Sequence, residues 1–191
     1  ARALRAETEH PLSLTGHDVD EARDIAWVAD TEFVNQIGYY LATRARLHRH
    51  AGDWAGAIAC ADRAAPLIPA IAGQTAEFDL VLHTALARLG LVLEDRGTLP
   101  DQRAAIEADL AQLAAWRAIH DGNFGAKSAL VGAVWAGVQG DMQAHLRLAD
   151  LARRIGPDHG LQDRALALEY AARLNSTLHS TRLAYLAMVS T

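Results

Sequence analysis

The sequence predicts an all-α protein built as an array of antiparallel helical hairpins. Alanine occurs 40 times and leucine 26 times among the 191 residues, and both residue types favour helices. Apolar residues recur three to four positions apart through most of the chain, which is the spacing of one helix face. The β-branched and aromatic residues are too sparse for a sheet protein. A short Gly-Asp motif recurs at two helix boundaries and indicates a repeated unit.

The N-terminal half is predicted to hold a linker followed by helices. Residues 1–16 are interpreted as a helix end or linker, and residues 17–191 as a single helical-repeat domain. The first helix begins near Asp18, and Pro66 and Pro69 end the third. The apolar faces of the predicted helices are Ala22, Ile25, Ala26 and Val28; Phe33, Ile37, Leu41, Ala45 and His48; Trp54, Ala57, Ala61 and Ala64; and Phe78, Val81, Leu82, Ala85, Leu89 and Val92.

The C-terminal half continues the same pattern. Asp101 and Asn123 are the expected N-caps of the next two helices, because short polar side chains accept hydrogen bonds from free N–H groups there. The expected apolar faces are Ile106, Leu110, Leu113 and Trp116; Phe124, Leu130, Val131, Val134, Trp135 and Val138; Met142, Leu146, Ala149, Ala152 and Ile155; Leu161, Ala165, Leu168 and Ala172; and Leu183, Leu186 and Val189.

Residues 50–58, "HAGDWAGAI", and residues 138–146, "VQGDMQAHL", carry the recurring motif. Gly52 and Gly140 are expected to turn the chain, because glycine adopts backbone angles that other residues avoid. Asp53 is expected to cap the following helix, and Gly140-Asp141 is expected to open the matching one. Trp54 and Met142 are then expected to enter the seam between paired helices, with Ala57 at a close approach.

Second helices begin after Gly52, Gly97 and Gly140 and again near Thr177, at spacings of 45, 43 and 37 residues. This period predicts a tetratricopeptide-like α-solenoid, in which a small residue, a turn glycine, an alanine and a terminal proline recur. The middle pair lacks the proline, and His145 replaces the alanine of the later pair. The structural repeat positions are Gly52, Asp53, Trp54, Ala57, Ala64, Pro69, Gly140, Asp141, Met142, Ala152 and Pro157.

The segment "NFGAKSALVGAVWAGVQGDMQAHLRLADLARRIGPDHGLQDRALALEYAARL" resembles the helical region of very large bacterial signalling proteins. Those proteins join a serine/threonine kinase-like domain, a nucleotide-binding ATPase domain, a helical array, a GAF domain and a histidine kinase. The resemblance covers roughly residues 37–187. It implies a cytoplasmic signalling parent whose kinase and ATP chemistry lies outside this segment.

Composition argues against several functions. A net charge of -5 and a pI near 6.0 argue against a general nucleic-acid binder. No apolar run approaches the ~20 residues needed to cross a bilayer, and the sequence lacks a phosphate-binding loop. Asp79/His83 and Asp141/His145 each share a helix face, but a solvated pair or a capping aspartate is the favoured interpretation over a metal or acid–base site. No catalytic, cofactor or metal site is therefore predicted.

Two features favour protein contacts. Arg44, Arg46 and Arg49 form a local basic cluster that could bind an acidic partner or phosphate. Alternatively, their positive charges stabilise the negative C-terminal end of the helix dipole. Trp27 is a candidate partner anchor.

The predicted function is an interaction and signal-transmission scaffold. Its partner would be another protein or a neighbouring domain of the same chain. The predicted inner faces consist almost wholly of Ala, Leu, Val and Trp, which favours this function over a polar ligand pocket. The C-terminal "RLAYLAMVST" stops within a helical pattern, which indicates a fragment of a longer protein. The alternatives are a helical-repeat sensor domain of a transcription regulator that binds a small ligand, or an enzyme with a pocket among the helices.

Overall fold

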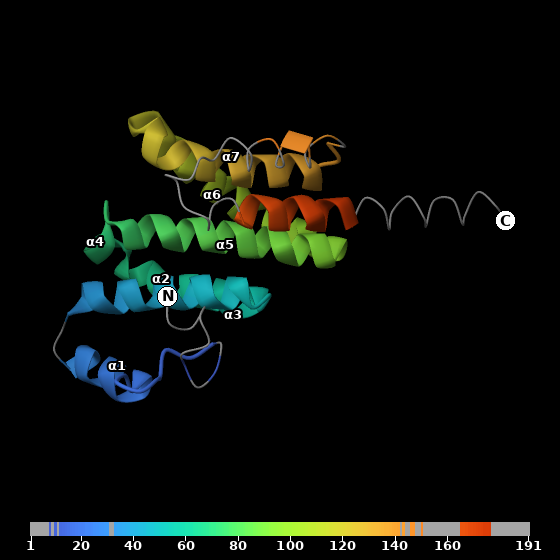
Figure 1. Ribbon diagram of the computed structural model, residues 1–191. Helices are drawn as coiled ribbons and strands as arrows, with labels where there is room; N and C mark the ends of the chain where they lie inside the picture. Colours follow the sequence, from blue (N-terminus) through green and yellow to red (C-terminus); the bar gives the residue numbers. More distant parts are fainter. Residues whose placement is uncertain are drawn as a thin grey trace. The chain divides into compact units, whose positions relative to one another are not determined.

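The computed structural model describes residues 8, 10, 12–30, 33–141, 143, 146, 147, 150 and 165–176, and this part of the chain is mostly helical (Figure 1). Within it, the only β-type pairings are isolated bridges at Thr8–Gly16 and Gly16–Val19. The all-α prediction is confirmed, whereas the solenoid arrangement stays a prediction. The α-helices are α1 (Glu21–Asp30), α2 (Val34–His50), α3 (Trp54–Ala64), α4 (Ile68–Ile71), α5 (Thr75–Glu94), α6 (Leu99–Ile119) and α7 (Asp121–Val138).

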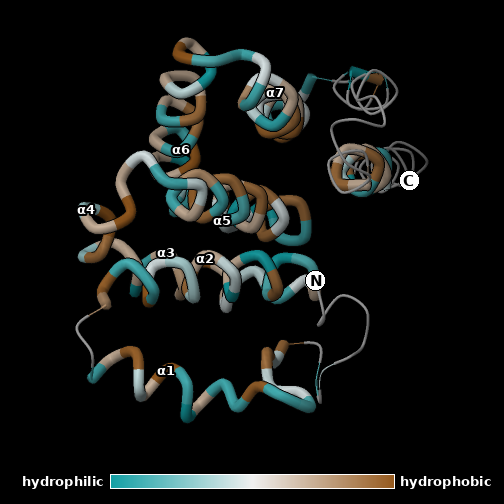
Figure 2. The backbone as a smooth tube through the Cα atoms, turned by 60° about the vertical axis from the view of Figure 1, so that its left-hand side comes forward, coloured by the Kyte–Doolittle hydropathy of each residue, from teal (hydrophilic) through white to brown (hydrophobic). Residues whose placement is uncertain are grey.

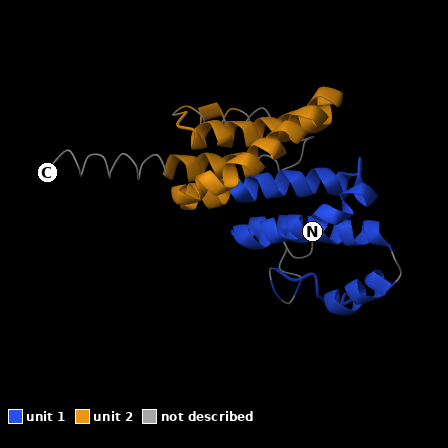
Figure 3. Cartoon of the chain, turned by 180° about the vertical axis from the view of Figure 1, so that it is seen from behind, with its two compact units in different colours: residues 1–88 blue, residues 89–191 orange. Residues whose placement is uncertain are grey.

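The chain divides into two compact units, residues 1–88 and residues 89–191 (Figure 3). The division falls within α5, so its first part belongs to unit 1 and its last residues to unit 2. Residues 165–176 add a further described helical segment to unit 2. The expectation of one repeat domain over residues 17–191 stays a prediction.

Unit 1 is organised around α2, which packs against α1, α3 and α4. Its core is aliphatic, and the alanines let the helix backbones approach closely. Gly38 marks one close approach, since a Cβ atom there would meet the side chain of Ile71 at 2.5 Å. The buried members of this core are Leu41, Ala42, Ala45, Cys60, Ala64, Ile71, Ala76 and Leu80.

In unit 2, α6 packs against α7. The hydroxyl of Ser128 donates to the carbonyl of Leu113 (3.1 Å) and links the two helices. The guanidinium of Arg103 lies 5.4 Å from the ring centre of Trp135, an arrangement that favours a cation–π attraction. Arg96 donates to the carbonyl of Val138 (2.7 Å) and so satisfies one of the free carbonyls at the end of α7.

The two Gly-Asp motifs form the same helix-ending turn. Gly52 and Gly140 have φ angles of 76° and 101°, which lie in the region that favours glycine. Gly52 N–H donates to the carbonyl three residues back, and Asp53 N–H to the carbonyl five residues back; Gly140 and Asp141 repeat both bonds. This pair of bonds is the Schellman motif, which gives hydrogen-bond donors to carbonyls that lack a partner at the end of a helix. The prediction that the two glycines turn the chain is confirmed.

The helix caps follow the prediction at one position and differ at two others. The side chain of Asp53 accepts from Gly56 N–H and caps α3, as expected. Asp101 instead lies in the first turn of α6, which begins at Leu99 after the N-cap Thr98 and has Pro100 as its second residue. Asn123 is likewise not a cap, because the side chain of His120 accepts from Asn123 N–H and α7 begins at Asp121.

The prolines end α3 in a different way from the one predicted. The helix stops at Ala64, and Pro66 lies in the short 3-10 turn Ala65–Leu67 that follows. Pro69 lies in the first turn of α4, where its missing N–H leaves no helical bond unmade. Three other repeat positions, Met142, Ala152 and Pro157, lie outside the described residues, as does His145.

Several expected apolar faces differ in the structure. No residue of α1 is buried, and its tube in Figure 2 alternates between hydrophilic and hydrophobic residues. Phe33 precedes α2 as its N-cap and is exposed. In residues 165–176 the expected face is wrong, because Ala165, Leu168 and Ala172 are exposed. The buried residues there are Leu166, Ala167, Tyr170 and Leu174.

Candidate interaction surface

A partly buried carboxylate, Glu21, fastens α1 and the segment before it to α2. The carboxylate accepts from Leu14 N–H at 2.9 Å, from the hydroxyl of Ser13 at 3.3 Å and from the hydroxyl of Tyr40 at 2.8 Å. It also forms an ion pair with Arg44 at 3.1 Å, in which only 15% of the Glu21 side chain and 20% of the Arg44 side chain are exposed. The same guanidinium group donates to the carbonyl of Leu12.

The network continues from Arg44 to the cap of α3. The Nη2 atom of Arg44 lies 3.1 Å from Nε2 of His48, and Nδ1 of His48 lies 2.7 Å from the Asp53 carboxylate. Because a guanidinium only donates hydrogen bonds, these distances assign the proton of a neutral His48 to Nδ1, which donates to Asp53. The other oxygen of Asp53 accepts from Gly56 N–H at 2.9 Å. One chain of contacts therefore joins residues 12–21, α2 and the start of α3.

The contacts of this network shift the pKa values of its members. Burial of Glu21 raises its pKa, but the hydrogen bonds from Leu14 N–H and Tyr40, together with the positive Arg44, outweigh it and hold the pKa below 4.5. The hydrogen bond from Gly56 N–H, followed by that from His48, lowers the pKa of Asp53. Burial, followed by the bond to Glu21, raises the pKa of Tyr40. Both carboxylates are therefore held in the charged form.

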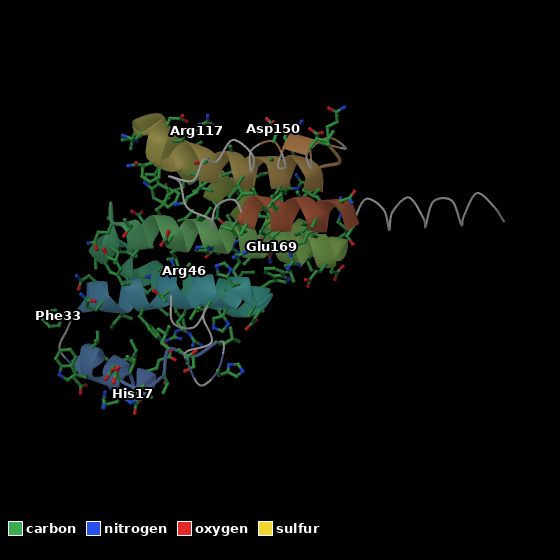
Figure 4. All side chains as sticks on the ribbon, in the orientation of Figure 1. His17, Phe33, Arg46, Arg117, Asp150 and Glu169 are labelled. Atoms are coloured by element: carbon green, nitrogen blue, oxygen red, sulfur yellow. The ribbon has the colours of Figure 1, made fainter. Side chains whose placement is uncertain are left out.

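The predicted basic cluster lies largely inside unit 1. Arg44 is engaged by Glu21, Leu12 and His48, as described above. The side chain of Arg49 is fully buried and is therefore not accessible to a partner. Arg46, labelled in Figure 4, is half-buried, and its Nε atom is enclosed without a hydrogen-bond partner.

Trp27, by contrast, is 62% exposed. It lies near the C-terminal end of α1, outside the half-buried set Glu21, Asp24, Ile25 and Val28. Phe33 is 54% exposed and follows six residues later, at the junction between α1 and α2 (Figure 4). Large exposed apolar side chains of this kind are typical of protein contacts. We call the side of α1 that exposes Trp27 the N-terminal apolar surface; Phe33 and Val34 are further exposed apolar residues at the start of α2.

A second candidate is a shallow groove beside α7, with a volume of about 560 Å³. Small residues of α7 form one wall, and a hypothetical Cβ atom at Gly132 would meet nothing within 4 Å. The rest of the lining comes from residues 143–150 and includes both polar side chains and Leu146. The lining residues are Ala129, Gly132, Ala133, Ala136, Gln143, Leu146, Arg147 and Asp150.

Among the described residues, the remaining sequence candidates do not gather into a site. His83 is only 4% exposed, so the interpretation of Asp79 and His83 as a solvated pair is wrong. Its ring lies 6.1 Å from that of His50. Burial raises the pKa of the Cys60 thiol and thus disfavours the reactive thiolate. No three His, Cys, Asp or Glu side chains within the described part of the chain are arranged to hold a metal ion.

Sequence reasoning missed the Glu21 network. Glu21 and Arg44 are 23 residues apart, and no helical spacing connects them. The only local signal was the acidic residue in the first turn of α1, which is also typical of any solvated helix start.

Comparison of the chain with family models, with curated proteins and with solved structures gave no match. The search for bilayer-spanning segments found none among the described helices.

Proposed function

We propose that this chain is a non-catalytic helical-repeat scaffold for protein interaction and signal transmission within a larger signalling ATPase or kinase protein. The supporting observation is the exposure of Trp27 on a helix that the Glu21–Arg44 ion pair holds in place. A fixed aromatic side chain loses little conformational freedom when it enters a partner, which makes it an effective anchor. The resemblance of residues 37–187 to helical arrays in bacterial signalling proteins supplies the proposed setting.

The polar network supports the transmission part of the proposal. A partner that displaces α1 would disturb Glu21, and through Arg44 and His48 it would disturb the cap of α3. Networks of hydrogen bonds and ion pairs that connect distinct helices are one route by which energetic coupling between surfaces is carried.

The experiment begins with the coding sequence on both sides of this segment. The proposal expects kinase-like, ATPase or GAF domains there, whereas a flanking DNA-binding domain would favour the regulator alternative. Each flanking domain is then titrated against this chain by calorimetry. Trp27→Ala should weaken binding about tenfold or more, while Ile119→Ala, which truncates an even more exposed apolar side chain on α6, should leave it unchanged. Equal effects of the two variants would contradict the proposal.

A small-ligand sensor is the second candidate, because the groove beside α7 falls within the size range of small-molecule sites. Gly132→Leu would fill the groove without meeting another atom near its Cβ. If the groove binds a ligand, any compound that raises the melting temperature of the native chain should lose that effect in Gly132→Leu. A ligand that stabilises both proteins equally would argue against a site in this groove.

A further inference from the structure

The N-terminal apolar surface carries more acidic than basic side chains. Asp20 precedes α1, Asp24 lies three residues before Trp27 and Asp30 three residues after it. Residues three or four apart lie on the same side of a helix, so Arg23, Asp24 and Asp30 all lie beside the indole. Arg23 and Asp24 form an ion pair at 2.9 Å, and their charges offset each other. Asp20 and Asp30 lie outside this pair and give this side of α1 its negative charge.

We infer that this surface binds a protein partner that presents an apolar pocket with lysine or arginine side chains at its rim. This inference rests on the proposed function and specifies the chemistry of its partner. The exposed indole would fill the pocket, and the rim cations would meet the aspartates. Complementary charges of this kind increase association rates and select partners.

The charge on α1 also distinguishes this partner from two other occupants. A second copy of the same surface would bring the aspartates of both copies together, which is unfavourable. A membrane containing anionic lipids would repel the same aspartates, although aromatic residues often lie at membrane surfaces. A cationic protein pocket satisfies both the apolar and the acidic side chains.

The inference can be tested without knowing the natural partner. The probe is an amphipathic helical peptide of leucine and lysine, and the matched probe replaces every lysine with glutamate. Binding to the intact chain is followed by the NMR signal of the Trp27 indole N–H, assigned by its loss in Trp27→Phe. We expect the lysine peptide to shift this signal, the glutamate peptide to leave it unchanged, and added salt to weaken the interaction.

A matched pair of charge variants separates local from general attraction. Asn retains the ability of Asp20 to cap α1, where the side chain accepts from Arg23 N–H, so the first variant should stay folded. Removing the three flanking charges should weaken binding of the lysine peptide about tenfold more than removing three exposed charges elsewhere. The first variant is Asp20→Asn/Asp24→Asn/Asp30→Asn, and the control is Asp62→Asn/Asp101→Asn/Glu107→Gln.

Each contrary outcome has a distinct meaning. Equal binding of the two peptides, or equal loss in the two charge variants, would overturn the inferred charge of the partner. Stronger binding of the Trp27 surface to phosphatidylcholine vesicles than to the lysine peptide would overturn a protein partner here. Neither result depends on the flanking domains, so the failure of this inference and the failure of the proposed function can be told apart.

Discussion

Gly56 illustrates how a single residue is constrained by a network that forms around it. It lies in the first turn of α3, and its N–H donates to the capping side chain of Asp53. A Cβ atom at this position would collide with Nδ1 of His48 and with the Asp53 carboxylate. The hydrogen bond between His48 and Asp53 therefore crosses the space that any other residue would need.

This constraint predicts opposite effects for the same substitution at two helical glycines. Gly132→Ala should stabilise the protein by about 0.5–1 kcal/mol, because the site is open and alanine favours the helix. Gly56→Ala gains the same propensity but displaces the cap, and should destabilise the protein by about 1 kcal/mol. Urea unfolding of both variants measures the difference. A stabilising Gly56→Ala would show that the His48–Asp53 contact does not hold the cap in place.

At the scale of the element, the Gly-Asp turn sets the register of the helix that follows it. The turn ends α2, Asp53 caps α3, and the first residue of α3 is the buried Trp54. Ala57 lies one turn further along the same face and is fully buried. Ala59, two residues later, is exposed. The face assigned to this part of α3 from the sequence is thus confirmed.

A comparison of two leucine variants measures the packing on this face. Ala57→Leu should overpack the seam and cost about 1–3 kcal/mol, whereas Ala59→Leu should change the free energy of unfolding by no more than about 0.5 kcal/mol. Helix propensity largely cancels, since the chemical change is identical. Urea denaturation gives both values, and a larger loss for Ala59→Leu would refute the packing of α3 against α2.

At the scale of the whole molecule, the lowered pKa values link proton binding to folding. Glu21 and Asp53 take up protons less readily in the folded chain than in the unfolded chain. Their contribution to stability is fully present when the pH is above the ordinary pKa values of the two carboxylates, 4.5 for Glu21 and 3.8 for Asp53. It is lost as the pH falls through the lower pKa values of the folded state, because protons then favour the unfolded chain.

Unfolding measured between neutral and acidic pH should therefore show a loss of stability below about pH 4.5. Glu21→Gln should be less stable than the native chain at pH 7, and this difference should shrink as the pH falls. Glu107→Gln is the matched control, because its carboxylate forms an exposed ion pair with Arg103. A constant difference between Glu21→Gln and the native chain at every pH would rule out the linkage.

The sequence by itself determined the helical class and the two Gly-Asp turns. Both depend on interactions within one or two helical turns, such as the glycine φ angle at Gly52 and the side-chain cap at Asp53. In residues 165–176, by contrast, the sequence did not determine which face is buried. Two apolar stripes with helical spacing are present there, and the structure buries the one that includes Tyr170 and Leu174. Periodicity alone does not choose between two such stripes.

Only the tertiary structure decided the partners of the charged residues. The pairing of Glu21 with Arg44 depends on α1 folding back along α2, and the burial of Arg49 depends on what packs around the end of α2. Long-range contacts of this kind leave no spacing in the sequence. The exposure of Trp27 follows from the same event, because the contacts of Glu21 fix which side of α1 faces α2 and which side remains open.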